Sequence, residues 1–289
     1  MTKRVRKAVL PVAGLGTRVL PAGKATPKNL LNVVDRPILA YVVAEARAAG
    51  IEHLIFIMGR GQGAIEDYFD HNPELETSLE SKGKTQLLTE VLGELGRPGE
   101  MSFVRQMAPL GLGHAVWCAR DLIGDEPFAV MLPDMLMAAD VPALAQCVAA
   151  HEKVGGNIVA VEPAPPGEAH KYGIVSLETS DGRLNRMTGM VEKPRPGTEP
   201  SNLFISGRYV LQPQIFELLG SQQKGAGGEI QLTDAMLRLL ESQSFHALEY
   251  EGTTYDCGDK LGLLRANVAF ALRRPDFADE ARRAIQALL

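Results

Sequence analysis

The chain has 289 residues, of which 22% are charged and 45% hydrophobic, the balance of an ordinary soluble enzyme. Its net charge of −5 gives no basic surface for nucleic acid, no apolar run reaches the roughly 18 residues of a membrane helix, and no signal-peptide pattern precedes the first predicted strand. Three cysteines without C-x-x-C spacing, Cys118, Cys147 and Cys257, indicate neither a disulfide framework nor a zinc site, and reduced thiols fit the cytoplasm.

Four cations precede the first predicted strand: Lys3, Arg4, Arg6 and Lys7. Runs of charge usually face solvent, so we interpret this run as a solvated flank of the strand. An anion-binding site is the less favoured interpretation.

The first predicted strand, 8–12, leads into a glycine-rich loop that is followed by two lysines. The residues that carry its chemistry are Gly14, Gly16, Thr17, Arg18, Lys24 and Lys28. Glycines let backbone N–H groups converge on an anion, and the arginine and lysines supply the charge that a phosphate chain requires. The loop lacks the Gly-Lys-Ser/Thr of a Walker motif, and Val19 stands where a dinucleotide motif has its third glycine. The pattern therefore predicts a phosphate-binding loop of another kind.

Strand and helix patterns alternate after this loop, which is typical of a parallel α/β sheet. The predicted strands are 54–58, 101–105, 128–132 and 158–161, and the predicted helices are 37–50, 62–69 and 141–151. Residues 73–95 are polar with a leucine stripe, which predicts a long helix or a pair of helices packed on the sheet edge.

Ligands of open α/β sheets gather at the carboxyl ends of strands, and two more predicted strands end in informative residues. Gln106 and Gly111 follow one of them, and Asp134 follows another. Asp134 is a candidate metal ligand, with a cap or turn aspartate as the alternative. His114 is a candidate base, but a histidine packed at a helix start is the favoured interpretation.

The pattern changes from Lys171 onward, where 172–175, 186–190 and 201–211 predict a mixed or antiparallel sheet laid against the first half. A glycine loop at 225–234, predicted to be mobile, leads into a helix that ends at Leu240. Other helices are predicted at 213–219, 260–272 and 275–289, and another strand-like segment ends at 255–258. No linker or internal repeat interrupts the chain, so we expect one domain with two lobes.

The motif G-x-G-T-R followed by P-x-x-K and P-K resembles the nucleotide-binding motif of sugar-nucleotide pyrophosphorylases. Its residues here are Gly14, Gly16, Thr17, Arg18, Pro21, Lys24, Pro27 and Lys28. The match continues in order and spacing at 41–43, 49–51, 111–116, 124–127, 132–134, 191–194, 200–203, 207–209, 228–234, 256–258 and 260–262. Over nearly its whole length the chain therefore resembles the bacterial UTP–glucose-1-phosphate uridylyltransferases, or UDP-glucose pyrophosphorylases.

The resemblance implies an α/β, Rossmann-like nucleotidyltransferase fold, in which helices flank a mixed, mostly parallel central sheet and a smaller part is antiparallel. It implies a single domain, 1–289, with 1–162 mainly nucleotide-binding, 163–260 mainly sugar-phosphate-binding and 261–289 forming C-terminal helices. The implied reaction joins UTP and glucose 1-phosphate to give UDP-glucose and pyrophosphate with Mg²⁺. A cytoplasmic homo-oligomer, dimer or tetramer, that supplies polysaccharide precursors and binds neither nucleic acid nor membrane is also implied.

The resemblance also implies roles for individual residues. The nucleotide-binding positions are Ala13, Gly14, Gly16, Gln106 and Gly111. The cationic, catalytic positions are Arg18 and Lys28 on the triphosphate and Lys193 on the sugar phosphate. Glucose 1-phosphate is expected at Gly173, Glu192 and Lys193, and Mg²⁺ at Asp134 and Asp256. For Asp256 the alternative is a cap of the helix that begins near Lys260.

Two residues depart from the family pattern. Asn29 replaces the usual glutamate of P-K-E, which removes a carboxylate expected near the nucleotide. Gly23 stands where threonine is common, which is expected to loosen the loop.

Three other functions are weighed against this one. A thymidylyltransferase would run the same chemistry on dTTP, but 73–95 and 228–234 favour the uridylyl family. A regulatory homologue without activity is expected to lose Lys28, Asp134 or Lys193, and all three are present. A dinucleotide-dependent oxidoreductase is disfavoured by the broken glycine pattern.

Overall fold

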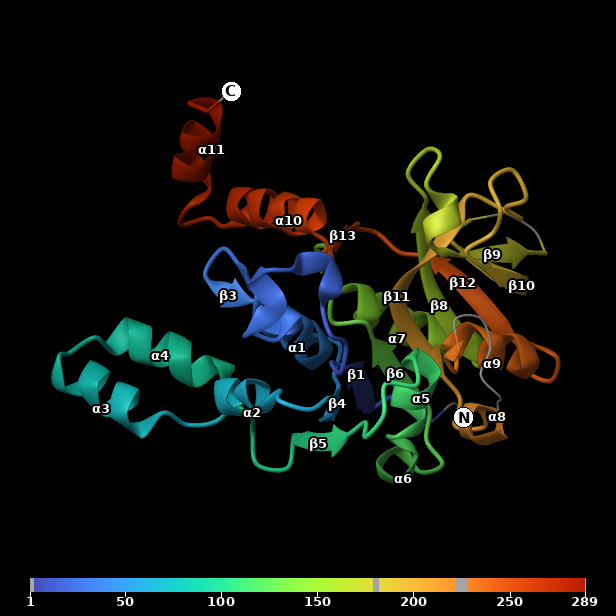
Figure 1. The fold of residues 1–289 in the computed structure, drawn as a ribbon, viewed down its shortest axis with the longest axis horizontal. Helices are drawn as coiled ribbons and strands as arrows, with labels where there is room; N and C mark the ends of the chain where they lie inside the picture. Colours follow the sequence, from blue (N-terminus) through green and yellow to red (C-terminus); the bar gives the residue numbers. More distant parts are fainter. Residues whose placement is uncertain (1–2, 179–181, 222–227, 289) are drawn as a thin grey trace.

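The computed structural model describes residues 3–178, 182–221 and 228–288. Through these residues runs a nine-stranded sheet of order β5-β4-β1-β6-β11-β8-β12-β10-β9 (Figure 1). Its strands are β1 (Lys7–Pro11), β4 (His53–Met58), β5 (Met101–Arg105), β6 (Phe128–Met131), β8 (Asn157–Pro163), β9 (Gly173–Leu177), β10 (Leu184–Glu192), β11 (Leu203–Leu211) and β12 (Phe245–Glu249). Two small ribbons lie beside it, β2 (Asn32–Val33) with β3 (Arg36–Pro37) and β7 (Met135–Ala138) with β13 (Thr253–Asp256).

The first half of the sheet is parallel, as predicted. β5, β4, β1 and β6 run side by side in the same direction, with Val9 opposite both Ile55 and Val130. Their carboxyl ends therefore open onto one edge of the sheet, which we call the carboxyl edge.

The second half continues the same sheet. β11 pairs antiparallel with both β6 and β8, and β10 and β9 follow beyond β12. The mixed sheet is confirmed, but the expectation of a second sheet laid against the first is wrong, because β11 bonds directly to β6. The strand β12 was not predicted, because its five residues alternate only weakly between apolar and polar.

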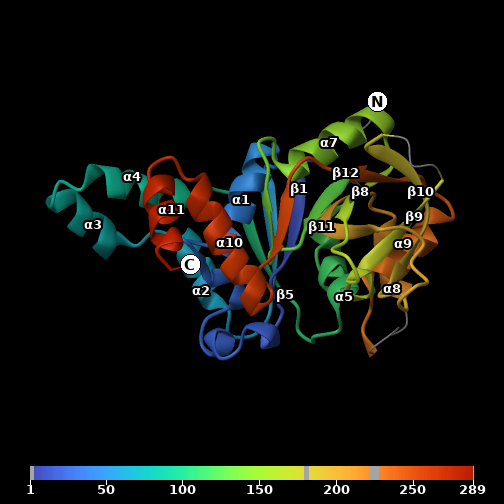
Figure 2. The same ribbon diagram turned by 90° about the horizontal axis from the view of Figure 1, so that it is seen from above.

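Helices cover both faces of this sheet (Figure 2). One face packs against α1 (Ile38–Ala48), α2 (Gly63–Phe69) and α7 (Ala143–Val154), and the other against α5 (Leu112–Trp117), α6 (Arg120–Ile123), α8 (Ile215–Ser221) and α9 (Leu232–Leu240). Helix α10 (Lys260–Arg273) packs instead on the small ribbons, against β13 and β2. Because side chains alternate along a strand, Ala8 and Leu10 enter the first core and Val9 enters the second.

Residues 73–95 form the predicted pair of helices, α3 (Pro73–Ser81) and α4 (Thr85–Glu94). The prediction that they pack on the sheet edge is wrong, because both views show the pair projecting from the body of the molecule (Figures 1 and 2). Leu79 is the one buried residue in the two helices. The end of α4 is held by an ion pair of 2.7 Å between Arg36 and Glu94.

The C-terminal segment forms α10 and a short terminal helix, α11 (Ala278–Gln286), that packs on α10. In the described part of the chain no helix has the length and apolar character needed to cross a membrane. The three cysteines are free thiols.

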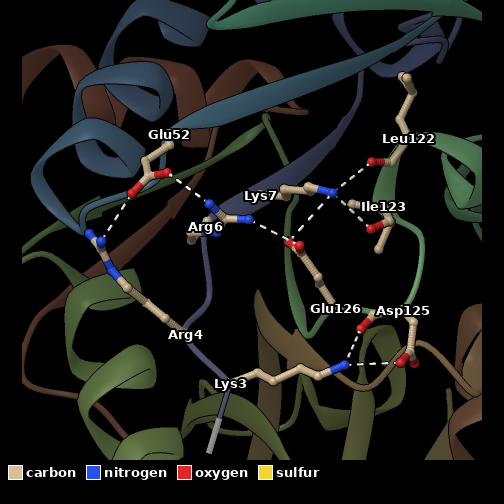
Figure 3. A network of polar contacts seen from close by, with 9 residues as sticks. All are labelled: Lys3, Arg4, Arg6, Lys7, Glu52, Leu122, Ile123, Asp125 and Glu126. Atoms are coloured by element: carbon tan, nitrogen blue, oxygen red, sulfur yellow. Dashed lines mark hydrogen bonds and ion pairs between the residues drawn. The ribbon is translucent and has the colours of Figure 1, made fainter.

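Lys3, Arg4 and Arg6 lie before β1, Lys7 is its first residue, and these four cations pair with carboxylates at the starts of neighbouring strands (Figure 3). Lys3 contacts Asp125, Arg4 contacts Glu52, and Arg6 contacts both Glu52 and Glu126 at 2.9 to 3.5 Å. Lys7 donates to the carbonyls of Leu122 and Ile123 and lies 3.4 Å from Glu126. We call Lys3, Arg4, Arg6 and Lys7 the amino-end cluster. The exposed, paired side chains of Lys3, Arg4 and Arg6 confirm the flank interpretation, whereas Lys7 is 20% exposed.

Candidate active site

The loop after β1 and Lys28 form one unit. A Cβ added at Gly16 would lie 2.9 Å from Lys28 Cβ, and Gly16 has φ of 65°, a conformation that favours glycine. A Cβ at Gly14 would lie 3.4 Å from Lys28 Cε. The two glycines therefore allow the lysine side chain to pass closely along the loop.

This unit borders a cavity of about 440 Å³ at the carboxyl edge, which we call the glycine-loop cavity. All five predicted nucleotide-binding residues line it, together with two predicted for phosphate and metal: Ala13, Gly14, Gly16, Gln106 and Gly111, with Lys28 and Asp134. Gln106 is buried and its Nε2 donates to the carbonyl of Gly111 at 3.1 Å. Gly111 has φ of 103°, and a Cβ there would lie 2.8 Å from the carbonyl oxygen of Ile230, so the segment before α9 closes over the cavity wall.

A smaller cavity of about 360 Å³ adjoins the glycine-loop cavity, and we call it the Lys24 cavity. The two share six lining residues: Ala13, Gly14, Leu15, Lys28, Gln106 and Pro109. Arg60 and Gln62, at the end of β4, also line the Lys24 cavity and were not predicted. The available signal was their position directly after another predicted strand, 54–58.

His114 lies within α5 and contacts Gln106 Nε2 and Trp117 rather than the glycine-loop cavity. Burial lowers the pKa of its imidazole, so the ring is neutral at pH 7 and Nδ1 accepts from Gln106. The favoured interpretation, a histidine packed at a helix start, is confirmed.

Asp134 and Asp256 lie side by side, as predicted, but not through the parallel sheet. The antiparallel ribbon of β7 and β13 pairs Asp256 with Met135, and the Cys257 N–H donates to the Asp134 carbonyl at 2.8 Å. β7 was missed because four residues directly after a strand gave no separate pattern. The cap of α10 is Asp259, whose side chain accepts from the Gly262 N–H, so the cap interpretation of Asp256 is wrong.

Cations hold both carboxylates. Lys28 Nζ lies 2.5 Å from Asp134 Oδ2, and Arg18 Nη1 lies 3.0 Å from Asp256 Oδ2. Burial alone would raise the pKa of Asp134, but the charge and hydrogen bond of Lys28 and the charge of Arg18 outweigh it and hold that pKa below its usual value. For Arg18, burial alone would lower the pKa of the guanidinium, but the charges of Asp256 and Asp134 and a hydrogen bond to Asp256 outweigh it and raise that pKa. Asp134 is therefore ionised, and Arg18 charged, at neutral pH.

The two carboxylates converge on Gly258, which the sequence did not single out for a role. A Cβ there would lie 2.7 Å from Asp256 Oδ1 and 3.0 Å from Asp134 Oδ2, and it would collide with Arg18 Nη2. Across residues 3–178, 182–221 and 228–288, no group of three or more His, Cys, Asp or Glu is arranged for a metal ion. Two carboxylates without a full protein cage fit Mg²⁺, which takes few carboxylates and completes its shell with phosphate oxygens and water.

A third cavity of about 680 Å³ lies on the other side of Asp134, and we call it the Glu192 cavity. Gly173, Glu192 and Lys193 line it, as do Arg18 and Asp256. The glycine-loop and Glu192 cavities share Asp134, so the predicted nucleotide and sugar-phosphate residues lie in adjoining hollows.

Three contacts shape the Glu192 cavity. The end of β10 pairs with the start of β9, which brings Glu192 opposite Gly173, where a Cβ would lie 3.1 Å from Glu192 Oε2. Thr233 at the start of α9 donates its hydroxyl to Glu192 Oε2 at 3.1 Å. Lys193 has a φ of 47°, and its N–H donates to the Tyr172 carbonyl at 3.0 Å. Thr233 had no predicted role, although it belongs to the matching segment 228–234.

Asn29 lies beneath the loop rather than in a cavity. It is fully buried, and its Nδ2 donates to the Val12 carbonyl at 3.2 Å beside a second donor, Gln62 Nε2, at 2.8 Å. Its side chain lines none of the three cavities described above. Gly23 packs against the loop, since a Cβ there would lie 3.3 Å from the Gly16 carbonyl oxygen. Residues 225–227 of the predicted mobile glycine loop lie outside the described residues.

A family model described as "Nucleotidyl transferase" matches residues 7–271 of this chain. A curated relative from Bacillus subtilis (strain 168), named UTP–glucose-1-phosphate uridylyltransferase, is 49% identical over 287 residues, covering 99% of this chain and 98% of the relative. A UTP–glucose-1-phosphate uridylyltransferase 2 from Staphylococcus saprophyticus is 46% identical and covers 96% of each chain.

Solved structures of UDP-glucose pyrophosphorylases also superpose on this chain. A UTP-bound UGPase from Acinetobacter baumannii superposes with a TM-score of 0.92 at 42% identity, covering 99% of this chain and 100% of that one. A UDP-glucose pyrophosphorylase complexed with UDP-glucose superposes with a TM-score of 0.82 at 37% identity, covering 93% of this chain and 100% of that one.

Proposed function

This chain belongs to the UTP–glucose-1-phosphate uridylyltransferases of the nucleotidyl transferase family, and we propose that it makes UDP-glucose where its two cavities share Asp134. A phosphate oxygen of glucose 1-phosphate attacks the α-phosphorus of UTP in line with the leaving group. The bond from that phosphorus to the bridging oxygen breaks, and pyrophosphate leaves. The attacking phosphate is already ionised at neutral pH, so no general base is required.

UTP occupies the glycine-loop cavity in this proposal. Backbone groups of Ala13 and Gly14 meet the uracil or ribose, and Gln106 and Gly111 flank the base. Lys28 reaches the triphosphate along the loop that Gly16 leaves open. Its charge reduces repulsion between two polyanions and stabilises charge that grows in the transition state. The alignment of both substrates supplies much of the remaining rate.

Glucose 1-phosphate occupies the Glu192 cavity. Glu192, held by Thr233, accepts hydrogen bonds from sugar hydroxyls, and Gly173 leaves room for the ring. Lys193 neutralises the phosphate, and Arg18 lies between this phosphate and the α-phosphate of UTP.

Mg²⁺ is held by Asp134 and Asp256, and when bound it offsets negative charge on the α-phosphate and the departing pyrophosphate. Ion pairs orient these carboxylates, Lys28 with Asp134 and Arg18 with Asp256. The convergence of both carboxylates with two cations, between two adjoining cavities, is the observation that carries this proposal.

The test is pyrophosphate release from UTP, dTTP, ATP and GTP, each with several sugar 1-phosphates. We expect reversible release that is fastest with UTP and glucose 1-phosphate and that stops when Mg²⁺ is chelated. Faster release with dTTP would favour thymidylyl transfer. No release from any pair, by folded protein supplied with Mg²⁺, would favour a sensor of sugar nucleotides.

We further propose that the enzyme is a cytoplasmic homo-oligomer, a dimer or tetramer, and supplies UDP-glucose as a polysaccharide precursor. Light scattering on the purified protein measures the oligomeric state. A monomer at micromolar concentration would contradict that part.

A further inference from the structure

A buried ion pair lies under the turn that carries Asp134. Arg208 on β11 is 0% exposed, and Glu45 on α1 is 10% exposed in its side chain. The guanidinium grips the carboxylate with two bonds, Nε to Oε1 at 3.0 Å and Nη2 to Oε2 at 2.7 Å. The Arg208 side chain lines none of the three cavities described above.

The same guanidinium bonds to the backbone on both sides of Pro133 and Asp134. Nη1 donates to the Leu132 carbonyl at 3.0 Å, and Nη2 donates to the Met135 carbonyl at 2.8 Å. Nη1 also donates to the Gly207 carbonyl at 3.2 Å. All five N–H donors of the arginine are thus used, which no other side chain can do.

The local path of β11 aims Arg208 at this turn. The register between β11 and β8 shifts between Ile205 and Tyr209, which marks a bulge, and bulges redirect side chains. Gly207 within the bulge has φ of 90°, and a Cβ there would lie 3.1 Å from Leu132 Cβ. Leu132 N–H in turn donates to the Gly207 carbonyl at 2.9 Å.

Stability alone is a weak reason for such a pair. The cost of desolvating two charges commonly matches or exceeds their attraction, and apolar replacements are often as stable. Here every Arg208 donor that does not bond to Glu45 bonds to a backbone carbonyl. Two of these carbonyls, those of Leu132 and Met135, lie on either side of Asp134 in the sequence. We propose that the Glu45–Arg208 pair is a positioning device that fixes the Asp134 carboxylate at the distance from Asp256 that the metal–nucleotide complex requires. The proposal rests on the metal role proposed above for Asp134.

A second buried ion pair, between Arg47 and Glu100, serves as a matched control, and its Arg47 lies on α1 as Glu45 does. Arg47 makes the same two-bond contact with Glu100, at 2.9 and 2.8 Å, and donates to the Leu95 carbonyl at 2.7 Å. This pair is also largely buried, but its carbonyl partners lie at the end of α4. It resembles the first pair in chemistry and differs in what it holds.

The experiment compares Arg208→Lys with Arg47→Lys, and the double variant Arg208→Met with Glu45→Leu against Arg47→Met with Glu100→Leu. Affinity for the Mn²⁺–UTP complex is measured by water proton relaxation, kcat and KM by pyrophosphate release, and stability by thermal unfolding. Lysine has three donors on one nitrogen and cannot span both carbonyls. We expect both Arg208 variants to bind Mn²⁺–UTP at least about tenfold more weakly and to lose kcat similarly, the usual cost of a lost partner behind a metal ligand.

The KM for glucose 1-phosphate should stay within about twofold, because Glu192 and Lys193 are not touched. The Arg47 variants should lose thermal stability and keep wild-type Mn²⁺–UTP affinity. Wild-type affinity and kcat in folded Arg208→Lys, or an equal change in the Arg47 variants, would overturn the proposal. Failure of both Arg208 variants to fold would overturn it as well, because the pair would then serve stability.

Asp134→Asn is measured in parallel to separate two kinds of failure. If Asp134→Asn keeps wild-type Mn²⁺–UTP affinity and activity, the metal role of Asp134 is wrong and the inference falls with it. If Asp134→Asn loses both while Arg208→Lys keeps both, the inference alone is wrong.

Discussion

Cations gather at both ends of β1, and their surroundings differ. At the amino end, Lys3 and Arg4 are 61% and 60% exposed and pair with carboxylates of adjacent strands. At the carboxyl end, Arg18 and Lys28 pair with Asp134 and Asp256, and those carboxylates face two cavities.

Lys7 and Lys28 make the comparison sharp. Their side chains are 20% and 17% exposed, and each lies beside one carboxylate. Burial and ion pairing therefore do not distinguish Lys7, which we expect to serve stability, from Lys28, for which we propose a catalytic role. The distinction lies in what surrounds the pair, because Lys28 runs along a glycine loop that borders a cavity, whereas Lys7 also bonds to two backbone carbonyls.

The largest expected effect separates these two lysines. Lys28→Ala should lower kcat by about a hundredfold or more, because its charge acts where charge develops in the transition state. Lys7→Ala should lower the thermal unfolding midpoint and leave kcat near wild type. Steady-state kinetics and thermal scans on both variants measure this. Equal losses of kcat in the two variants would show that the loss comes from a general distortion of β1 and not from the charge of Lys28.

Lys193 tests whether the carboxyl-edge cations divide between substrates. It lines the Glu192 cavity and is 65% exposed. Lys193→Ala should raise the KM for glucose 1-phosphate by about tenfold, the scale of one charge-assisted contact, and change the KM for UTP little. A larger change in the UTP KM would mean that Lys193 serves the nucleotide. The matched control is Lys171→Ala, since Lys171 lines the same cavity and pairs with Glu168.

A smaller effect is expected beneath the glycine loop. Asn29→Asp keeps the shape but replaces the amide that donates to the Val12 carbonyl with a carboxylate that cannot. The UTP KM should rise about threefold, the scale of one weak hydrogen bond, and the unfolding midpoint should fall. Asn157→Asp is the control, because Asn157 is also fully buried and donates to a backbone carbonyl, that of Ser244, far from the cavities. It should lower the midpoint and leave the UTP KM unchanged.

The smallest effect concerns pH and the amino end. Partial burial raises the pKa of Glu126, but Arg6 and Lys7 outweigh it and hold that pKa below its ordinary value of 4.5. A carboxyl with a depressed pKa in the folded state adds stability above 4.5, which is lost as pH falls through the lower folded value. Glu126→Gln should therefore flatten the loss of stability below about pH 4.5. Thermal midpoints from pH 7 to 3 measure it, and kcat at pH 7 should not change.

Strands of the first half were predictable because apolar runs such as that of β4 are buried on both faces. The residues around the cavities were predictable because glycines and charges follow these strands. The route that joins Asp134 to Asp256 was not, since β7 and β13 are four residues each and pair only through tertiary structure. Nor was the partnership of Glu45 with Arg208, because nothing in the surroundings of either residue in the sequence indicates the other.

Because Asp256 lies in the late strand β13, the site can be completed only near the end of synthesis of the chain. Arg18 and Asp256 are 238 positions apart in the sequence, yet they share an ion pair at the centre of the site. At typical elongation rates the ribosome needs on the order of ten to fifty seconds to add the intervening residues. Throughout that interval the nascent chain displays its glycine loop and lysines without the second carboxylate. A translation product that stops before β13 therefore carries most of the proposed binding residues but lacks Asp256, so its site is incomplete.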